Sequence, residues 1–159
     1  MRNNIYKNCG CIRIAMFSRF FTKVYKKLSF EDIQFANQYA DQFIIINTLP
    51  IDEQSCLIKN TIPYIDEETL LNNLLTNYGL NEKKLIIYGR NNTDDTINIK
   101  YDQLVNLGFQ SVYLYVGGLF EWLCLQDIYG KDEFPTTTHT LDMLKYKPVR
   151  TFGGYLLTR

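Results

Sequence analysis

The sequence predicts an α/β domain in which a central parallel β-sheet carries helices on both faces. Short apolar runs alternate along the chain with longer segments of helical periodicity, which is the pattern of repeated strand–helix–strand units. The apolar runs are continuous, as expected for strands that are covered on both sides. With 159 residues, 46% of them hydrophobic, and only four prolines, the chain is long enough for one domain with a substantial core.

The first regular elements follow Ser29. Ser29 and Asp32 have the spacing of a capping box and predict the start of a short helix, with Ile33 and Ala36 on its apolar face. The continuous apolar run at residues 43–46 then predicts the first strand of the sheet.

The next helix and strand are indicated by similar signals. Asp66 is expected to cap the helix and Gly79 to end it. Its apolar side chains fall on one stripe: Leu70, Leu71, Leu74, Leu75 and Tyr78. The apolar run within Lys84–Tyr88 predicts the strand that follows.

Two more helices and one more strand complete the predicted sheet. A helix is expected over residues 97–107 and a strand over residues 111–116. The apolar side of this helix comprises Ile97, Tyr101, Leu104 and Val105. Gly117 and Gly118 then open a helix over residues 119–126, which is apolar nearly all round and therefore predicted to be buried.

The most informative segment is the polar loop that separates the strand ending at Tyr88 from the helix starting near Ile97. A loop in this position gathers free backbone N–H groups beside the positive end of the helix dipole, so it is where an α/β protein holds an anion or activates a nucleophile. The first residue of the loop is Gly89, which supplies no nucleophile. Glycine is also the residue expected for a tight turn with a positive φ.

The order of these segments resembles that of rhodanese-like domains. The matching features are the strand ending in Tyr88, the loop from Gly89, the Leu107-Gly108-Phe109 segment, the strand Val112–Tyr115, and the Gly117-Gly118 turn with Trp122. The resemblance covers residues 29–130 and implies a three-layer α/β domain with a central parallel sheet. In active members of the family, a cysteine at the start of a six-residue loop accepts a sulfur atom as a persulfide and passes it on.

This sequence departs from the family pattern at the residues that perform the chemistry. Gly89 stands at the position of the cysteine, and Asp94 stands where the family often has a basic residue. Further upstream, Asn47 and Leu49 replace an Asp and an Arg of the family pattern. The carboxylates of Asp94 and its neighbour Asp95 would also repel an anionic sulfur donor.

We therefore expect a catalytically inactive rhodanese-like domain that acts as a binding or regulatory module. Its active-site-like loop comprises Gly89, Arg90, Asn91, Asn92, Thr93 and Asp94, and the expected ligand is a protein partner or a small anion. For Arg90 two interpretations stay open. Its guanidinium binds a phosphate or carboxylate of a ligand, or it pairs with Asp94 or Asp95, which is the commoner arrangement.

An alternative hypothesis is a thiosulfate-type sulfurtransferase that uses a relocated cysteine. Cys56, in a polar loop that we expect to be exposed, is the candidate, because loops at the carboxyl ends of parallel strands meet over the sheet. Cys124 falls within an apolar helix and is expected to be a core thiol. Cys9, Cys11 and the single histidine, His139, which we expect at the surface, are too few for a zinc site. We predict no metal and no cofactor.

Composition divides the chain into a basic N-terminal arm (residues 1–28), the rhodanese-like domain (29–130) and a C-terminal extension (131–159). Residues 1–30 hold seven basic and no acidic side chains, whereas the rest of the chain holds 10 basic and 17 acidic ones. The acidic balance predicts no nucleic-acid partner for the domain. For the arm, three interpretations stay open: an organelle presequence, a segment that contacts a membrane surface, or a tail that packs on the domain.

The placement of the cysteines predicts the cellular compartment of the protein. The irregular placement of the four cysteines predicts reduced thiols and a cytoplasmic protein, with organelle targeting by the arm as the alternative. No apolar run is long enough to cross a bilayer. In the C-terminal extension, Leu141, Leu144 and Tyr146 predict one short helical stripe, and residues 151–159 are expected to be a mobile tail.

Overall fold

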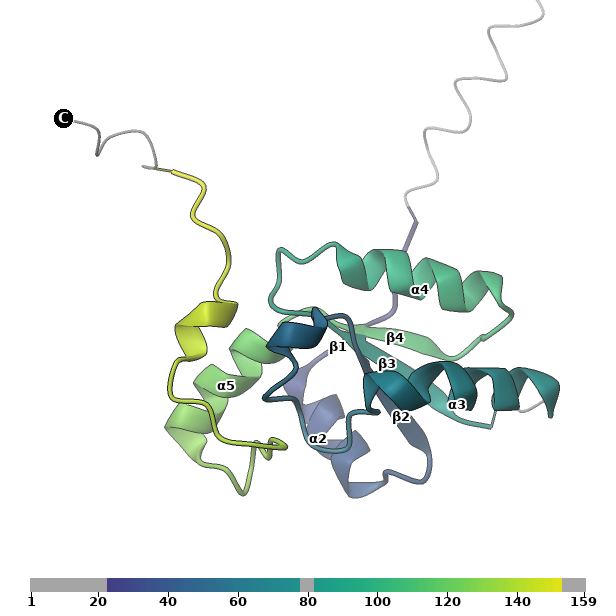
Figure 1. Cartoon of the computed structure of the whole chain (residues 1–159), viewed down its shortest axis with the longest axis horizontal. Coiled ribbons are helices and arrows are strands. Elements are labelled where there is room, and N and C mark those ends of the chain that lie inside the picture. Colours follow the sequence, from purple (N-terminus) through teal and green to yellow (C-terminus); the bar gives the residue numbers. More distant parts are fainter. Residues whose placement is uncertain (1–22, 78–81, 153–159) are drawn as a thin grey trace, which may run out of the picture.

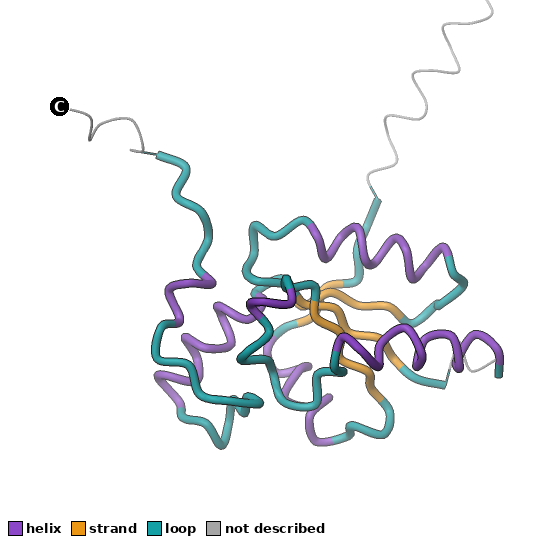
Figure 2. The backbone as a smooth tube through the Cα atoms, in the orientation of Figure 1, coloured by secondary structure: helices purple, strands orange, loops and turns teal. Residues whose placement is uncertain are grey.

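A four-stranded parallel sheet lies at the centre of the computed structural model, which describes residues 23–77 and 82–152 (Figure 2). The strand order is β1-β4-β3-β2, and every neighbouring pair is parallel. The strands are β1 (Lys27–Leu28), β2 (Phe43–Asn47), β3 (Lys84–Tyr88) and β4 (Val112–Tyr115). The predicted parallel sheet is confirmed.

Four α-helices and two short 3₁₀ helices complete the described part of the chain. They are α2 (Phe30–Gln38), α3 (Tyr64–Thr76), α4 (Thr96–Asn106), α5 (Gly118–Tyr129), η1 (Ile51–Glu53) and η2 (Met143–Tyr146). Helices α2 and α5 pack on one face of the sheet, and α3 and α4 pack on the other (Figure 1). The molecule therefore has the three-layer α/β architecture that the sequence predicts.

Burial on both faces explains why the strands are continuously apolar. In β2, Ile44 and Ile46 contact the cluster under α3 and α4, whereas Ile45 contacts the cluster under α2 and α5. Each of these side chains is at most 2% exposed. Fully burying a side chain of this size contributes about 1.5–3 kcal/mol, so neither face of the strand tolerates a polar residue.

The helix starts follow local chemistry, with one correction. The Asp32 carboxylate accepts the Ser29 backbone N–H at 2.9 Å, which confirms the predicted capping box. The prediction that Asp66 caps the next helix is wrong, because α3 begins two residues earlier, at Tyr64, directly after Pro63. The fixed φ of proline is already suited to a helix start, so Asp66 lies instead within the first turn. The predicted end of this helix at Gly79, and Tyr78, lie outside the described residues.

The other helices are more exposed than their patterns predict. The helix predicted over residues 119–126 continues to Tyr129; Leu119, Trp122 and Leu123 are buried as predicted, whereas Ile128 and Tyr129 in the additional turn are 70% and 64% exposed. In α4, Ile97, Tyr101 and Leu104 are buried as predicted, while Val105 lies at the edge of the stripe and is exposed.

The C-terminal extension packs on the loop that follows β2. Thr136 forms an antiparallel bridge with Ile58, and the Thr137 N–H donates to the Leu57 carbonyl at 2.8 Å. Of the predicted stripe only Tyr146 is buried, because the segment forms a short 3₁₀ helix that presents a narrower face than an α-helix. Residues 153–159 of the expected mobile tail lie outside the described residues.

The last residues of the basic N-terminal segment belong to the sheet. Lys27 and Leu28 form the edge strand β1 and pair with Leu114 and Tyr115 of β4. Residues 1–22 of the predicted arm lie outside the described residues. None of the helices in the described part is long and apolar enough to cross a membrane.

Candidate functional site

The loop over residues 89–95 joins β3 to α4 at the carboxyl edge of the sheet and is fastened to α5. The N–H groups of Leu119 and Phe120 donate to the carbonyls of Gly89 and Arg90, each at 2.9 Å. Gly118 makes this approach possible. It has a φ of +65°, and a Cβ there would lie 2.7 Å from the Gly89 carbonyl oxygen. The second glycine of the pair is thus explained by the close packing of a helix N-terminus on the loop.

The carboxylate of Asp94 is folded back into this loop. Its Oδ2 accepts the Arg90 backbone N–H at 2.8 Å. Its Oδ1 accepts the Thr96 backbone N–H at 3.0 Å and the Thr96 hydroxyl at 2.6 Å. Asp94 therefore accepts one N–H of the loop and the first N–H of α4, so its carboxylate lies where the sequence predicts room for an external anion.

Gly89 is required by that carboxylate and not by the turn. The expectation of a positive φ at Gly89 is wrong, because the positive φ values among the described glycines belong to Gly108, Gly118 and Gly130. A Cβ at position 89 would instead collide with Asp94 Oδ2 and lie 2.9 Å from both Asp94 Cγ and Ile97 Cγ2. The space in which a cysteine side chain would begin is filled by the side chain of Asp94.

The guanidinium of Arg90 pairs with Glu53 of η1, and not with Asp94 or Asp95 as the favoured interpretation expected. The reason is that both oxygens of Asp94 already accept hydrogen bonds from the loop and from Thr96. The hydrogen bond to Glu53 raises the pKa of Arg90 above its ordinary value, and the carboxylates of Asp94 and Asp52 add to the effect against the opposing cost of burial.

Asn91 links the loop to the C-terminal extension. Its side chain is 4% exposed, and its Nδ2 donates to the Tyr146 carbonyl at 2.7 Å. Its Oδ1 accepts the Thr93 backbone N–H and hydroxyl at 3.0 and 2.7 Å. Asn92, between them, is exposed. Sequence reasoning placed Asn91 in the loop but gave it no role, since its partner is 55 residues away.

Residues next to the loop have structural roles. The buried Tyr88 hydroxyl accepts the Ile58 N–H at 3.2 Å and shares a hydrogen bond with the Thr61 hydroxyl at 3.0 Å. Burial raises the pKa of Tyr88 well above its ordinary value, so the phenol stays neutral. At the end of β2, Asn47 Oδ1 accepts the Leu49 N–H at 3.1 Å, and both side chains are buried.

The thiols in the described residues are poorly placed to replace the missing nucleophile. The expectation that Cys56 is exposed is wrong, because the C-terminal extension covers its loop. The side chain is 1% exposed and its Sγ donates to the Thr138 carbonyl at 3.2 Å. Cys124 is half-buried near Met143, and burial raises the pKa of its thiol. Cys9 and Cys11 lie outside the described residues.

Two further observations bear on ligands. His139 is exposed, as predicted. Over residues 23–77 and 82–152, there is no group of three or more His, Cys, Asp or Glu side chains that could hold a metal ion.

Two neighbouring cavities lie at this edge of the sheet. The first, the loop cavity, has a volume of about 240 Å³ and is lined by Pro50, Arg90, Asp94 and Val149 among others. The second, the interhelical cavity, has a volume of about 280 Å³ and lies between α3 and α4, with Tyr64, Glu67, Ile99 and Lys100 in its wall. Both include Thr48 and Thr96, whose hydroxyls are hydrogen-bonded at 2.7 Å and separate the cavities.

Similarity to solved structures identifies the fold. No protein-family model matches the sequence, and no curated protein sequence matches it. The BH2092 protein of Bacillus halodurans is 18% identical over 72% of this chain and 82% of its own, with a TM-score of 0.51. The single-domain sulfurtransferase RDL2 of Saccharomyces cerevisiae is 16% identical over 69% of this chain and 98% of its own, with a TM-score of 0.50.

A third structure, the Rhodanese_3-like domain of the Alr3790 protein from Anabaena sp., is 21% identical over 60% of this chain and 99% of its own, with a TM-score of 0.43. The first two similarities, together with the parallel sheet and its two helical layers, establish the architecture. The chain therefore has a rhodanese-like α/β fold.

Proposed function

We propose that this protein is a rhodanese-like domain that does not transfer sulfur and that acts as a binding or regulatory module through its loop. The observation that carries the proposal is the position of Asp94. Its carboxylate lies where the side chain of a residue at position 89 would begin, and it accepts the N–H groups of Arg90 and Thr96. The loop has an internal anion in place of a nucleophile.

Electrostatics support the same conclusion. A sulfur donor such as thiosulfate carries negative charge and would have to approach the Asp94 carboxylate, with Asp95 exposed beside it. Two unit charges 4 Å apart repel by about 4 kcal/mol at the effective dielectric constant of a protein surface. The only cation of the loop, Arg90, is already paired with Glu53. The relocated-thiol alternative is disfavoured by the burial of Cys56.

Intact-mass spectrometry after incubation with thiosulfate tests the proposal. Four reduced full-length proteins are compared: the natural chain, Gly89→Cys, Asp94→Ala, and the double variant Gly89→Cys/Asp94→Ala. In a competent site the thiolate attacks the outer sulfur of thiosulfate, a new S–S bond forms, and sulfite leaves with the electron pair of the broken S–S bond. Without a sulfur acceptor the reaction stops there, so the protein gains one sulfur atom.

We expect no added sulfur on the natural chain, little on Gly89→Cys, and one sulfur atom on the double variant. The double variant differs from the single one because removal of the carboxylate leaves only the Ile97 methyl group of the three nearest obstructing atoms and frees the N–H donors that stabilise the persulfide. Gly89→Ser/Asp94→Ala is the control, since it opens the same space without a thiol. Sulfur on a cysteine of the natural chain would contradict the proposal, and peptide mapping would then identify the thiol.

A further inference from the structure

We propose that the carboxyl edge of the sheet, across the loop cavity and the interhelical cavity, binds an extended peptide that carries an acidic residue next to apolar ones. This inference rests on the proposed function, since it specifies the partner of the same loop. Three independent properties of the surface support it: an apolar rim, polar lining groups, and a basic segment without ion pairs to the described residues.

The rim of the two cavities is apolar and exposed. Tyr64 and Ile99 line the interhelical cavity and are 59% and 60% exposed. Ile65, which follows Tyr64 in the sequence, is 86% exposed. At the loop cavity, Val149 is 83% exposed, and Ile51 next to the lining residue Pro50 is 69% exposed. Large apolar side chains gathered around a concave site and left in water indicate a surface that is covered by a partner.

The floor between these side chains is polar but uncharged over much of its extent. Asn47 and Gln103 line the interhelical cavity, and neither side-chain amide donates a hydrogen bond to another group in the part of the chain that the structure describes. The hydroxyls of Thr48 and Thr96 form the ridge between the cavities. Amides and hydroxyls both donate and accept, which is what an extended backbone with its alternating N–H and C=O groups requires.

Two cavities that share the Thr48–Thr96 ridge favour an extended chain that crosses the ridge over a compact ligand that fills one cavity. Alternate side chains of a strand lie on one side of it. Side chains of residues i and i+2 of one peptide would enter the two cavities. The hydrogen-bonding groups of the ridge would face the residue between them.

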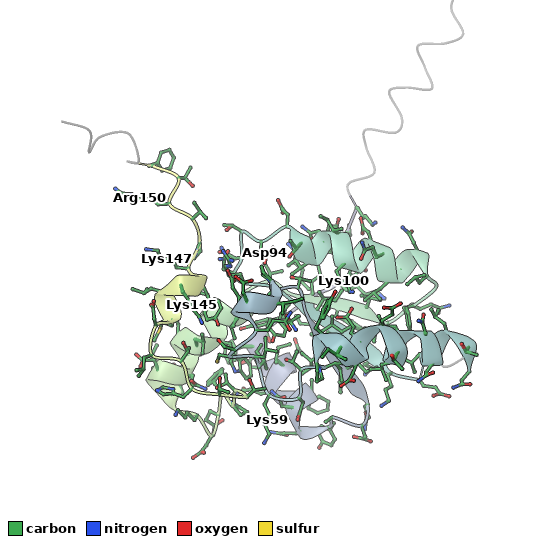
Figure 3. All side chains as sticks on the ribbon, in the orientation of Figure 1. Lys59, Asp94, Lys100, Lys145, Lys147 and Arg150 are labelled. Atoms are coloured by element: carbon green, nitrogen blue, oxygen red, sulfur yellow. The ribbon has the colours of Figure 1, made fainter. Side chains whose placement is uncertain are left out.

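The charge of the partner follows from the C-terminal strap, which we define as residues 143–152. It contains Lys145, Lys147 and Arg150 and no acidic residue. None of the three forms an ion pair with any residue that the structure describes. In Figure 3 all three lie on the strap to one side of Asp94, with Lys100 on the other side. An acidic side chain of the peptide at this end would pair with them.

The same surface argues against a nucleic acid as the partner. The loop cavity includes Asp94, the interhelical cavity includes Glu67, and Asp52 lies close enough to act on Arg90. A phosphate backbone carries a charge at every step and would be repelled along the groove, whereas one acidic side chain placed at the strap would not.

Selection of a displayed random heptapeptide library on the full-length protein tests the proposal. Enriched sequences are synthesised and their dissociation constants are measured by fluorescence anisotropy. We expect the enriched peptides to share an acidic residue beside alternating apolar residues. Binding should weaken about tenfold or more in Ile99→Glu, because a charge enters the apolar rim. It should weaken about tenfold in Lys147→Glu/Arg150→Glu, and weaken further as salt is raised.

Two matched variants control for general effects. Ile128→Glu removes a similarly exposed apolar side chain from the far end of α5, and Lys59→Glu reverses an exposed cation away from the strap (Figure 3). Both should leave the dissociation constant unchanged. The proposal is overturned if no peptide is enriched, if the peptides bind Ile99→Glu as well as the natural chain, or if Ile128→Glu weakens binding as much.

Two other ligands would give different results, and either result would overturn the proposal of a peptide partner. Binding of a single-stranded oligonucleotide that is lost in Lys147→Glu/Arg150→Glu would assign the strap to nucleic acid, and concentration-dependent dimerisation lost in Ile99→Glu would assign the rim to a second copy. The thiosulfate experiment is independent of all these readouts. Sulfur on the natural chain defeats the proposed function even if peptides bind, and its absence leaves the peptide proposal to be decided by affinity alone.

Discussion

Gly89 is the first residue of the loop, and Gly118 is the first residue of α5, the helix that packs on this loop. Gly118 has a left-handed φ and would place a Cβ against backbone atoms of Gly89, Arg90 and Asn91. Gly89 lacks a positive φ, and the obstruction there comes from the side chains of Asp94 and Ile97. Backbone contacts between α5 and the loop thus hold the loop in place, while the Asp94 side chain fills the space beside Gly89. We expect that a side chain at Gly118 disrupts the backbone contacts, whereas the Asp94 side chain can be replaced.

The largest expected effect is that of Gly118→Ala. Left-handed φ and a contact of 2.7 Å with the Gly89 carbonyl act together, so we expect the free energy of unfolding to fall by about 3 kcal/mol or more. Urea unfolding measures it. Gly130→Ala is the matched control, since Gly130 also has a left-handed φ, +97°, but meets no atom within 4 Å. Its cost should be only the backbone strain, about 1–3 kcal/mol. Equal losses of unfolding free energy in Gly118→Ala and Gly130→Ala would mean that the close packing of α5 on the loop contributes nothing to stability.

The next effect is that of Asn91→Ala, which removes the link between the loop and the C-terminal extension. The substitution leaves the Tyr146 carbonyl and the Thr93 N–H without their partner, and we expect a loss of about 2 kcal/mol in unfolding free energy. Asn92→Ala changes an exposed neighbour and should cost less than about 0.5 kcal/mol. If the two variants are equally stable, the buried amide does not join the loop to the extension.

A smaller effect is expected at Gly89, where the Asp94 side chain fills the space. Gly89→Ala forces a Cβ against Asp94, and we expect it to cost about 1–2 kcal/mol in the natural background. In Asp94→Ala the same change meets only the Ile97 methyl group, so the double-mutant cycle should show a favourable coupling of about 1 kcal/mol. Unfolding of the four proteins in urea supplies the cycle. Additive losses would show that Asp94 does not fill the space at position 89.

The elements of the fold were predictable because their signals are local or periodic. The Ser29–Asp32 capping box, the two-sided burial of residues 44–46 and the stripe of α4 each follow from residues within one or two turns of one another. Errors arose where the end of an element depends on its neighbours. Helix α5 runs three residues beyond its predicted end at residue 126, and Ile128 and Tyr129 in this added turn are exposed.

The site was predictable in place but not in its contacts. The loop and the absence of a nucleophile at Gly89 can be seen in the sequence. The partners of Arg90 and Asn91 cannot, since they lie 37 and 55 residues away and carry no pattern that points to the loop. The burial of Cys56 likewise depends on Thr138, at a separation of 82 residues. Such long-range pairs form when the elements pack together, and the residues around each partner do not reveal them.

The smallest expected effect concerns Arg90, whose carbonyl binds α5 while its guanidinium pairs with Glu53. The two side chains of this pair are still 33% and 26% exposed, so Arg90→Gln should cost only about 0.5–1 kcal/mol. The difference from the natural chain should shrink in about 1 M NaCl, since screening weakens exposed pairs. Unfolding in urea at low and high salt measures both quantities.

Glu53→Gln is the matched partner variant, and its loss should not add to that of Arg90→Gln, because both remove the same pair. A loss above about 2 kcal/mol that is insensitive to salt would contradict this expectation. The guanidinium would then hold the loop as firmly as the backbone contact at Gly118 does. In that case the loop would depend on a side chain as much as on its backbone contacts. A small, salt-dependent loss leaves the backbone hydrogen bonds to Leu119 and Phe120 as the contacts that hold the loop in place.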